Sequence, residues 1–184
     1  MDKELESNIS YTICYALRHE PWKFKLELDE NGFCEVNDLL ESLKSYYENI
    51  TVSDIEYIVK NDVKGKFQLI EGRIRAVYGH SFERRIIYDE ITPPNILYHG
   101  TTLEVYTEFI SKEGLKHQKR QYVHLSSTVE TALMVARRRK NKTHIVLEID
   151  TLEAYDGGIK FYKANDDIYL STNVPAKYLK IKKI

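Results

Sequence analysis

Two side chains that can handle phosphate and protons stand side by side in the stretch YALRHEP, namely Arg18 and His19. Arginine holds phosphate oxygens through paired donors, and histidine exchanges protons near neutral pH. The same pair would also be ordinary at a helix C-terminus, where positive side chains complement the negative end of the dipole by about 0.3–1 kcal/mol. Judged alone, the pair therefore leaves two interpretations open, a favourable helix end and a phosphate site.

Three other places in the first half of the chain could meet an anion. Lys66 stands between a glycine and a phenylalanine, and taken alone it would be a solvated surface lysine. Arg75 shares one face of an expected strand with a second arginine, a pattern that also protects sheet edges. His80 and Ser81 follow Gly79 at the end of that strand, where backbone donors could bind an anion. A plain loop is the alternative there.

Polar residues also follow the ends of expected strands in the second half. His99, Gly100 and Thr101 come between a strand and a helix, where backbone N–H groups could hold a polar ligand and glycine permits close approach. Arg120 precedes a strand whose His124 and Ser126 point to one side, with apolar residues on the other. A half-exposed sheet shows the same alternation, so this pattern is not specific for a ligand site.

The helices and strands that must position these residues form two groups along the chain. The first group consists mainly of helices. Apolar residues recur at helical spacing until Pro21 ends the first helix. Two more helices are expected after N-caps at Asn37 and at Thr51, the latter with Asp54 as a capping box. A turn between two extended pieces is expected at Asn31-Gly32, and a hairpin is expected around Glu71-Gly72. Three helices followed by a two-stranded hairpin are the pattern of a winged-helix lobe.

A polar passage at 81–94 is the expected linker. Beyond it we expect two helices, at about Thr102–Lys112 and Thr128–Arg139. They alternate with five short strands: ILYH, YVHLS, THIVLEI, DIYLS and KYLKI. The sequence therefore predicts an α+β protein with two lobes, 1–90 and 91–184.

Composition limits the function classes. The chain of 184 residues is 42% hydrophobic and 30% charged, a globular balance. Residues 1–90 hold 12 Lys and Arg against 18 Asp and Glu, whereas 91–184 hold 15 against 10. Neither lobe has the strong basic excess of nonspecific nucleic-acid binding, so we expect phosphate contacts to be local.

The sequence also gives no sign of a membrane protein, a secreted protein or a metal-binding protein. No apolar run reaches bilayer length, and the start MDKELE lacks the features of a secretory signal, so we expect a cytoplasmic protein without a membrane partner. The two cysteines match no metal-ligand spacing, and we expect reduced thiols and no metal.

Taken in order, the pieces LRHEP, LELDENGF, GRIRAVYGHS, LYHGT, KRQYVHLS and DIYLS resemble the RNA 2′-phosphotransferase family (KptA type). The resemblance extends from about Leu17 to Leu179. It implies an N-terminal winged-helix RNA-binding lobe and a C-terminal NAD-binding lobe with the split β-sheet of the ADP-ribosyltransferase fold. It also implies a transferase that consumes NAD⁺ as a co-substrate.

The implied reaction has two steps. An internal 2′-phosphate of RNA, such as a tRNA splice junction carries, attacks C1″ of the nicotinamide ribose and expels nicotinamide. The ribose 2″-hydroxyl of this 2′-phospho-ADP-ribosylated RNA then attacks the phosphate. The products are RNA with a 2′-hydroxyl and ADP-ribose 1″,2″-cyclic phosphate.

By motif, the resemblance implies roles for particular residues. The catalytic set is Arg18, His19, Lys66 and Arg120, which would form a phosphate clamp across the two lobes. The expected NAD⁺ contacts are His99, Gly100, Thr101, His124, Leu125, Ser126 and Ile168. The expected RNA-phosphate contacts are Arg75, His80 and Ser81.

Two positions depart from the family pattern. The family has arginine where this chain has Lys66, and glutamine where it has Tyr78. Lysine keeps the charge but lacks the planar fork of arginine, which puts phosphate affinity or rate in question.

Two other functions remain alternatives. One is an ADP-ribosyltransferase that stops after the first step and modifies terminal phosphates of nucleic acid or a protein. The other is an RNA-binding relative with weak or absent catalysis. We expect a monomer in each case.

Overall fold

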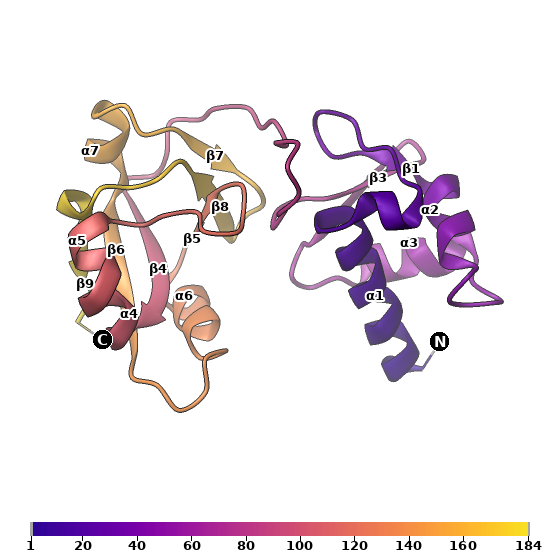
Figure 1. Ribbon diagram of the computed structural model, residues 1–184, viewed down its shortest axis with the longest axis horizontal. Coiled ribbons are helices and arrows are strands. Elements are labelled where there is room, and N and C mark those ends of the chain that lie inside the picture. The colour runs from indigo at the N-terminus through magenta and orange to yellow at the C-terminus, as the bar shows by residue number, and fades with distance from the viewer. Residues whose placement is uncertain (1, 184) are drawn as a thin grey trace. The chain divides into compact units, whose positions relative to one another are not determined.

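The computed structural model describes residues 2–183 and divides the chain into two compact units. The N-terminal unit is Met1–Ile87 and the C-terminal unit is Tyr88–Ile184 (Figure 1). The division falls three residues before the predicted one. Each unit contains an antiparallel sheet with helices, so the mixed α and β composition is confirmed. Within the described residues, no helix is both long and apolar enough to cross a membrane.

Helix α1 (Lys3–Arg18) opens the N-terminal unit, and its length follows from local signals. The carboxylate of Asp2 caps it by accepting from the backbone N–H of Leu5 at 2.8 Å. His19 is the C-cap, and the short 3₁₀ helix η1 (Pro21–Phe24) follows because proline cannot continue an α-helix. The predicted end of the first helix is confirmed.

Helices α2 (Val36–Leu43) and α3 (Val52–Lys60) complete the helical part of the N-terminal unit. The predicted capping box of Thr51 and Asp54 is present. The predicted N-cap at Asn37 is wrong, because α2 begins at Val36, directly after a strand. The N–H of Val36 donates to the carbonyl of Gly72 at 2.8 Å, so the end of this strand sets where the helix starts.

The sheet of the N-terminal unit has the strand order β1-β3-β2, with antiparallel neighbours. Its strands are β1 (Cys34–Glu35), β2 (Phe67–Ile70) and β3 (Arg73–Ala76). Glu71 and Gly72 join β2 to β3 with φ of 48° and 78°, which is the left-handed pair that a tight hairpin turn requires. The predicted hairpin at this turn is confirmed.

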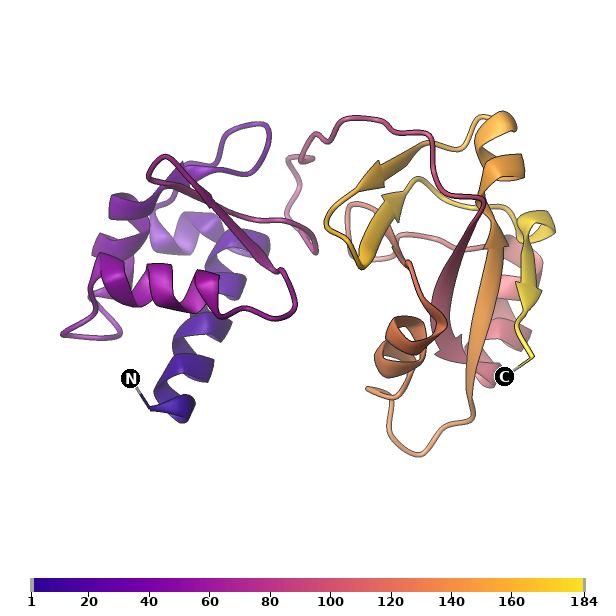
Figure 2. The same ribbon diagram turned by 180° about the vertical axis from the view of Figure 1, so that it is seen from behind.

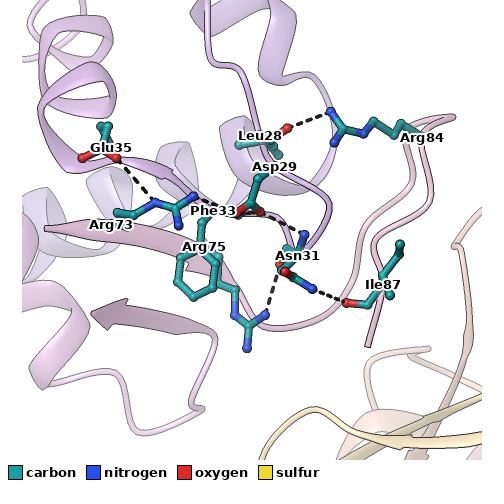
Figure 3. Close-up of polar contacts among 9 residues, drawn as sticks. All are labelled: Leu28, Asp29, Asn31, Phe33, Glu35, Arg73, Arg75, Arg84 and Ile87. Atoms are coloured by element: carbon teal, nitrogen blue, oxygen red, sulfur yellow. Dashed lines mark hydrogen bonds and ion pairs between the residues drawn. The ribbon is translucent and has the colours of Figure 1, made fainter. Parts of the chain in front are cut away.

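The turn expected at Asn31-Gly32 is present, but the extended piece expected before it does not form a strand. Within the described chain, residues 21–33 contain no strand, and β1 pairs with β3 instead. The carboxylate of Asp29 accepts from the backbone N–H groups of Asn31 at 2.9 Å and Phe33 at 2.8 Å, which closes a tight turn (Figure 3). The alternating apolar residues before this turn reflect burial in the core, which needs no strand partner.

The C-terminal unit is built on a six-stranded antiparallel sheet of order β7-β8-β5-β4-β6-β9. Its strands are β4 (Ile96–Thr102), β5 (Val123–Ser126), β6 (His144–Asp150), β7 (Phe161–Lys163), β8 (Ile168–Ser171) and β9 (Leu179–Ile181). The five predicted strands are all present, and β7 is additional.

Strand β4 pairs very differently with its two neighbours in this sheet. Strand β4 pairs with β6 along its whole length, from Ile96 to Thr102. With β5, by contrast, the described residues of β4 form one pair, Tyr98 with Ser126. The two central strands therefore diverge beyond Tyr98, directly beside His99.

Helices lie on both sides of this sheet. A continuous helical run of α4 (Leu103–Val105), π-helical η2 (Tyr106–Ile110) and α5 (Ser111–Glu113) matches the predicted first helix. Helix α6 (Val129–Ala136) lies on the other side of β4 and ends three residues before its predicted end (Figures 1 and 2). Helix α7 (Thr151–Asp156) and the 3₁₀ turn η3 (Ala176–Tyr178) were not predicted.

Candidate active site

Arg18 is the last residue of α1, and its guanidinium lies in a space that glycine leaves open. Its Cζ is 4.7 Å from the centre of the Tyr78 ring. A Cβ at Gly79, whose φ is +97°, would lie 3.3 Å from the Cδ of Arg18. Among the described residues, Nε and Nη2 of Arg18 are buried without a hydrogen-bond partner. Buried guanidinium donors normally find partners, so this side chain retains capacity to bind an anion.

His19 is held in place by Ser81, which follows strand β3. Its Nδ1 shares a hydrogen bond of 2.8 Å with Oγ of Ser81. The N–H of Ser81 donates in turn to the carbonyl of Arg18 at 2.9 Å. One of the last carbonyls of α1 is therefore already satisfied, which lessens the repulsion that a helix C-terminus exerts on an anion.

His80 directly precedes Ser81 and is buried, with 3% of its surface exposed. Burial lowers the pKa of His80 to about 3, and the charges of Arg18, Arg75 and His19 add to the effect. Arg18, Arg75 and His19, three of the predicted site residues, therefore lie near enough to this ring for their charges to act on it. His80 itself is neutral at pH 7, so it does not supply the positive charge expected of a phosphate ligand.

Lys66 lines the same pocket of about 630 Å³ as Arg18 and His19. Its Nζ donates to Oγ of Ser10 at 2.7 Å and lies 3.5 Å from Oδ1 of Asp62. The structure thus brings three of the four predicted catalytic residues together within the N-terminal unit. The charge of Lys66 is partly neutralised by Asp62, whose side chain is only 5% exposed.

Arg75 belongs to a network on the hairpin of β2 and β3. Its Cζ lies 4.5 Å from the centre of the Phe33 ring, and Arg73 lies 5.3 Å from the same ring (Figure 3). Arg75 donates to the carbonyl of Asn31 at 3.1 Å and to Oε1 of Gln68 at 2.8 Å. These hydrogen bonds hold the guanidinium of Arg75 in place. From there its charge helps to lower the pKa of His80.

In the C-terminal unit, His99 lies where β4 and β5 diverge. Its Nδ1–H donates to the carbonyl of His124 at 2.9 Å, because a carbonyl can only accept. Burial lowers the pKa of His99, and the charges of Arg139 and Arg120 lower it further. The ring is therefore neutral, with Nε2 as its accepting nitrogen. An accepting imidazole is chemically suited to a ribose hydroxyl, so the residues present fit a nucleotide such as NAD⁺.

Gly100 packs closely against helix α6. A Cβ at this position would lie 1.8 Å from the carbonyl oxygen of Ala132 in α6. The side of Gly100 on which a Cβ would stand is therefore filled by this helix, which leaves the backbone of Gly100 for a ligand. Thr101 is only 2% exposed, so its side chain is equally withdrawn from solvent.

The remaining predicted NAD⁺ contacts divide between the two faces of the sheet. Ser126 pairs with Tyr98 and with Ile168, so these three residues share one face. His124 lies on that face by alternation and donates from Nδ1 to the carbonyl of Tyr122 at 3.1 Å. Leu125 points into the core and is 1% exposed, which leaves only its backbone for a ligand.

Arg120 is exposed in the loop before β5. Its N–H donates to the carbonyl of His117 at 3.1 Å, and Nδ1–H of His117 donates back to the carbonyl of Arg120. This reciprocal pair holds the loop backbone, and Arg120 as a whole residue is exposed. The charge of Arg120 contributes to the lowered pKa of His99, so the two side chains lie in the same region of the C-terminal unit.

Two partners of the site were missed from the sequence. Asp62 precedes Lys66 by four residues, a spacing that could have indicated an ion pair across a turn. Ser10 contacts Lys66 from 56 residues away, and no local signal reveals such a contact.

Comparison with known proteins identifies the family. Residues 4–173 match the model of "RNA 2′-phosphotransferase, Tpt1 / KptA family". The chain belongs to this family.

Relatives that match nearly the whole chain come from several organisms. A "Probable RNA 2′-phosphotransferase" of Acetivibrio thermocellus is 42% identical over 178 residues, which are 96% of this chain and 97% of the relative. Proteins of the same name are 40% identical in Bacillus thuringiensis subsp. konkukian, over 96% of both chains, and 41% identical in Pyrococcus furiosus, over 92% of this chain and 91% of the relative. The family likeness therefore covers both units.

Proposed function

We propose that this protein is an NAD-dependent RNA 2′-phosphotransferase that removes an internal 2′-phosphate, as at a tRNA splice junction. The observation that carries the proposal is the pocket of the N-terminal unit that Arg18, His19 and Lys66 line together. Two donor nitrogens of Arg18 are buried there without partners among the described residues, as an anion site requires. Family membership and the names of the relatives support the same activity.

The order of elements supports the roles of the two units. In the N-terminal unit, α1, β1, α2, α3, β2 and β3 follow the order of a winged-helix domain, which we propose binds RNA. In the C-terminal unit, the divergence of β4 and β5 beside His99 supports a split sheet of the ADP-ribosyltransferase kind, which we propose binds NAD⁺.

In the first step, an oxygen of the RNA 2′-phosphate forms a bond to C1″ of the nicotinamide ribose while the bond to nicotinamide nitrogen breaks. A phosphomonoester is mostly dianionic at pH 7, so it needs no base. Arg18 would orient this phosphate through its two available donors. Neutral His99 would accept a ribose hydroxyl at Nε2.

In the second step, the ribose 2″-oxygen bonds to phosphorus and loses its proton, while the bond from phosphorus to the RNA 2′-oxygen breaks. The departing 2′-oxygen must gain a proton, and His19 is the proton donor that we propose. Arg120 and Lys66 would stabilise the charge that builds on the phosphate oxygens. The products are RNA with a 2′-hydroxyl and ADP-ribose 1″,2″-cyclic phosphate.

The test is an incubation of the protein with NAD⁺ and an oligoribonucleotide that carries one internal 2′-phosphate. Nicotinamide release and both products are followed by chromatography and mass spectrometry. Dephosphorylated RNA together with ADP-ribose cyclic phosphate supports the proposal, and the same RNA without the 2′-phosphate is the control. If nicotinamide is not released with the phosphorylated RNA, the enzymatic function is refuted and an RNA-binding role remains.

The ion pair between Lys66 and Asp62 favours a second candidate function. Because Asp62 partly neutralises the lysine, charge stabilisation in the second step is weakened. The protein could then act as an ADP-ribosyltransferase whose ADP-ribosylated product accumulates. We expect Arg120→Ala to increase this accumulation more than it weakens substrate binding, measured by quenched-flow analysis of RNA species. Equal loss of both steps would contradict the role proposed for Arg120.

A further inference from the structure

The pocket that holds Arg18 continues along α1 toward its N-terminus. Ser7, Tyr11, Cys14 and Arg18 all line it. Their spacing of four, three and four residues places them on one face of the helix. Lys3, in the first turn, lines the same pocket at its far end. The proposed phosphate site is therefore one end of a longer groove, which we call the α1 groove.

Tyr11 is the prominent side chain of the α1 groove. It is 72% exposed, although an aromatic ring gains free energy from burial. It stands seven residues before Arg18, which corresponds to about 10 Å along the helix axis. That distance equals roughly three steps of stacked nucleic acid at about 3.4 Å each.

The charges along the α1 groove favour an anionic chain. Lys3 and Lys64 line it in addition to the proposed phosphate ligands. The acids of the lining are Glu6 and Asp62, and Asp62 is already paired with Lys66. A positive groove with an exposed aromatic ring is the combination by which proteins hold single-stranded nucleic acid.

We propose that the α1 groove binds the single-stranded RNA next to the 2′-phosphate, with a nucleobase stacked on Tyr11. This inference rests on the proposed function and adds a substrate subsite to it. Arg18, His19, Lys66 and Tyr11 line one continuous pocket, so an RNA held at Arg18 can follow the groove to Tyr11. Stacking tolerates any base, so the subsite would recognise strand length and not sequence.

The experiment compares RNAs of increasing length. Substrates with one 2′-phosphate are extended from two to six nucleotides, in one series on the 5′ side and in another on the 3′ side. With the wild-type protein we expect KM to fall about tenfold along one series, at unchanged kcat. In Tyr11→Ala this gain should disappear, whereas turnover of the dinucleotide should be unchanged. Tyr11→Phe, which keeps the stacking ring, should restore the gain.

The matched control is Tyr57→Ala, since Tyr57 is an exposed tyrosine of α3 that does not line the α1 groove. It should leave the length dependence intact. The inference is overturned if the wild type shows no length dependence, or if Tyr57→Ala removes it as fully as Tyr11→Ala does.

Binding of the same RNAs, measured by fluorescence anisotropy, separates this inference from the proposed function. If no RNA is turned over, the enzymatic function fails. The affinities of wild type and Tyr11→Ala for two- and six-nucleotide RNAs then still decide whether the α1 groove binds a strand. Equal affinities of the two proteins for the longer RNA would overturn the inference.

Discussion

Replacement of Gly100 by alanine tests whether this glycine serves a ligand or the packing of α6 on β4. The added Cβ would lie 1.8 Å from the carbonyl oxygen of Ala132, where ordinary contact begins at 3.4 Å. It would also lie 3.1 Å from the backbone N of Ala136. Both atoms belong to the backbone of α6, so no side-chain rotation can relieve the contact and the helix must move away from the sheet.

The expected cost follows from this geometry. Overpacking of a core typically destabilises a protein by about 1–3 kcal/mol. A clash with backbone should cost at least the upper value of this range, because backbone cannot rotate away as a side chain can. We therefore expect Gly100→Ala to lower the free energy of unfolding of the C-terminal unit by at least about 3 kcal/mol. For a unit of this size, that loss corresponds to a drop in Tm of roughly 12 °C or more.

The assay is urea denaturation of wild type and variant, with NAD⁺ binding measured by calorimetry on the folded protein. Gly158→Ala is the matched control, because its Cβ meets open space and only the positive φ of +91° strains it, at about 1–2 kcal/mol. If Gly100→Ala unfolds like the wild type while NAD⁺ binding is lost, the glycine serves ligand approach and the packing argument is refuted.

Two further predictions concern the N-terminal unit. Lys66→Arg should leave turnover equal or increased, because arginine adds a bidentate fork for phosphate; an inactive variant would show that position 66 is not part of the clamp. His80 has a folded pKa of about 3 against about 6.5 when unfolded, so between these values the unfolded state binds the extra proton and stability falls as pH falls. The loss from pH 6.5 to 5 should be about 1.5 kcal/mol. His80→Gln should reduce this pH dependence in urea denaturation, and an unchanged slope would contradict a neutral, buried His80.

Much of the candidate site was accessible from local sequence signals. The position of Arg18 and His19 at a helix end followed from the apolar period and from Pro21, and the structure confirms it. The segment with His80 and Ser81 was correctly expected after a strand. The strand that is missing before Asn31-Gly32 was expected from the same kind of signal, but a turn preference does not specify which segments will pair.

The electrostatic state of the site could not be predicted. The sequence shows that His80 exists, but only the fold surrounds it with Arg18, Arg75 and His19 and removes it from water. A pKa depends on burial and on charges brought close in space, and none of these three residues is its neighbour in the sequence.

The sequence by itself determined most helices, the capping box at Thr51, most strands and the family of this protein, because these depend on backbone preferences and side-chain patterns within a few residues. The tertiary structure decided the rest. It placed Ser10 and Asp62 on Lys66, laid Arg18 over Tyr78, and filled the space at Gly100 with α6. Except for the pair of Lys66 and Asp62, these contacts join residues far apart in the chain, and packing and charge select them only once the whole unit has folded.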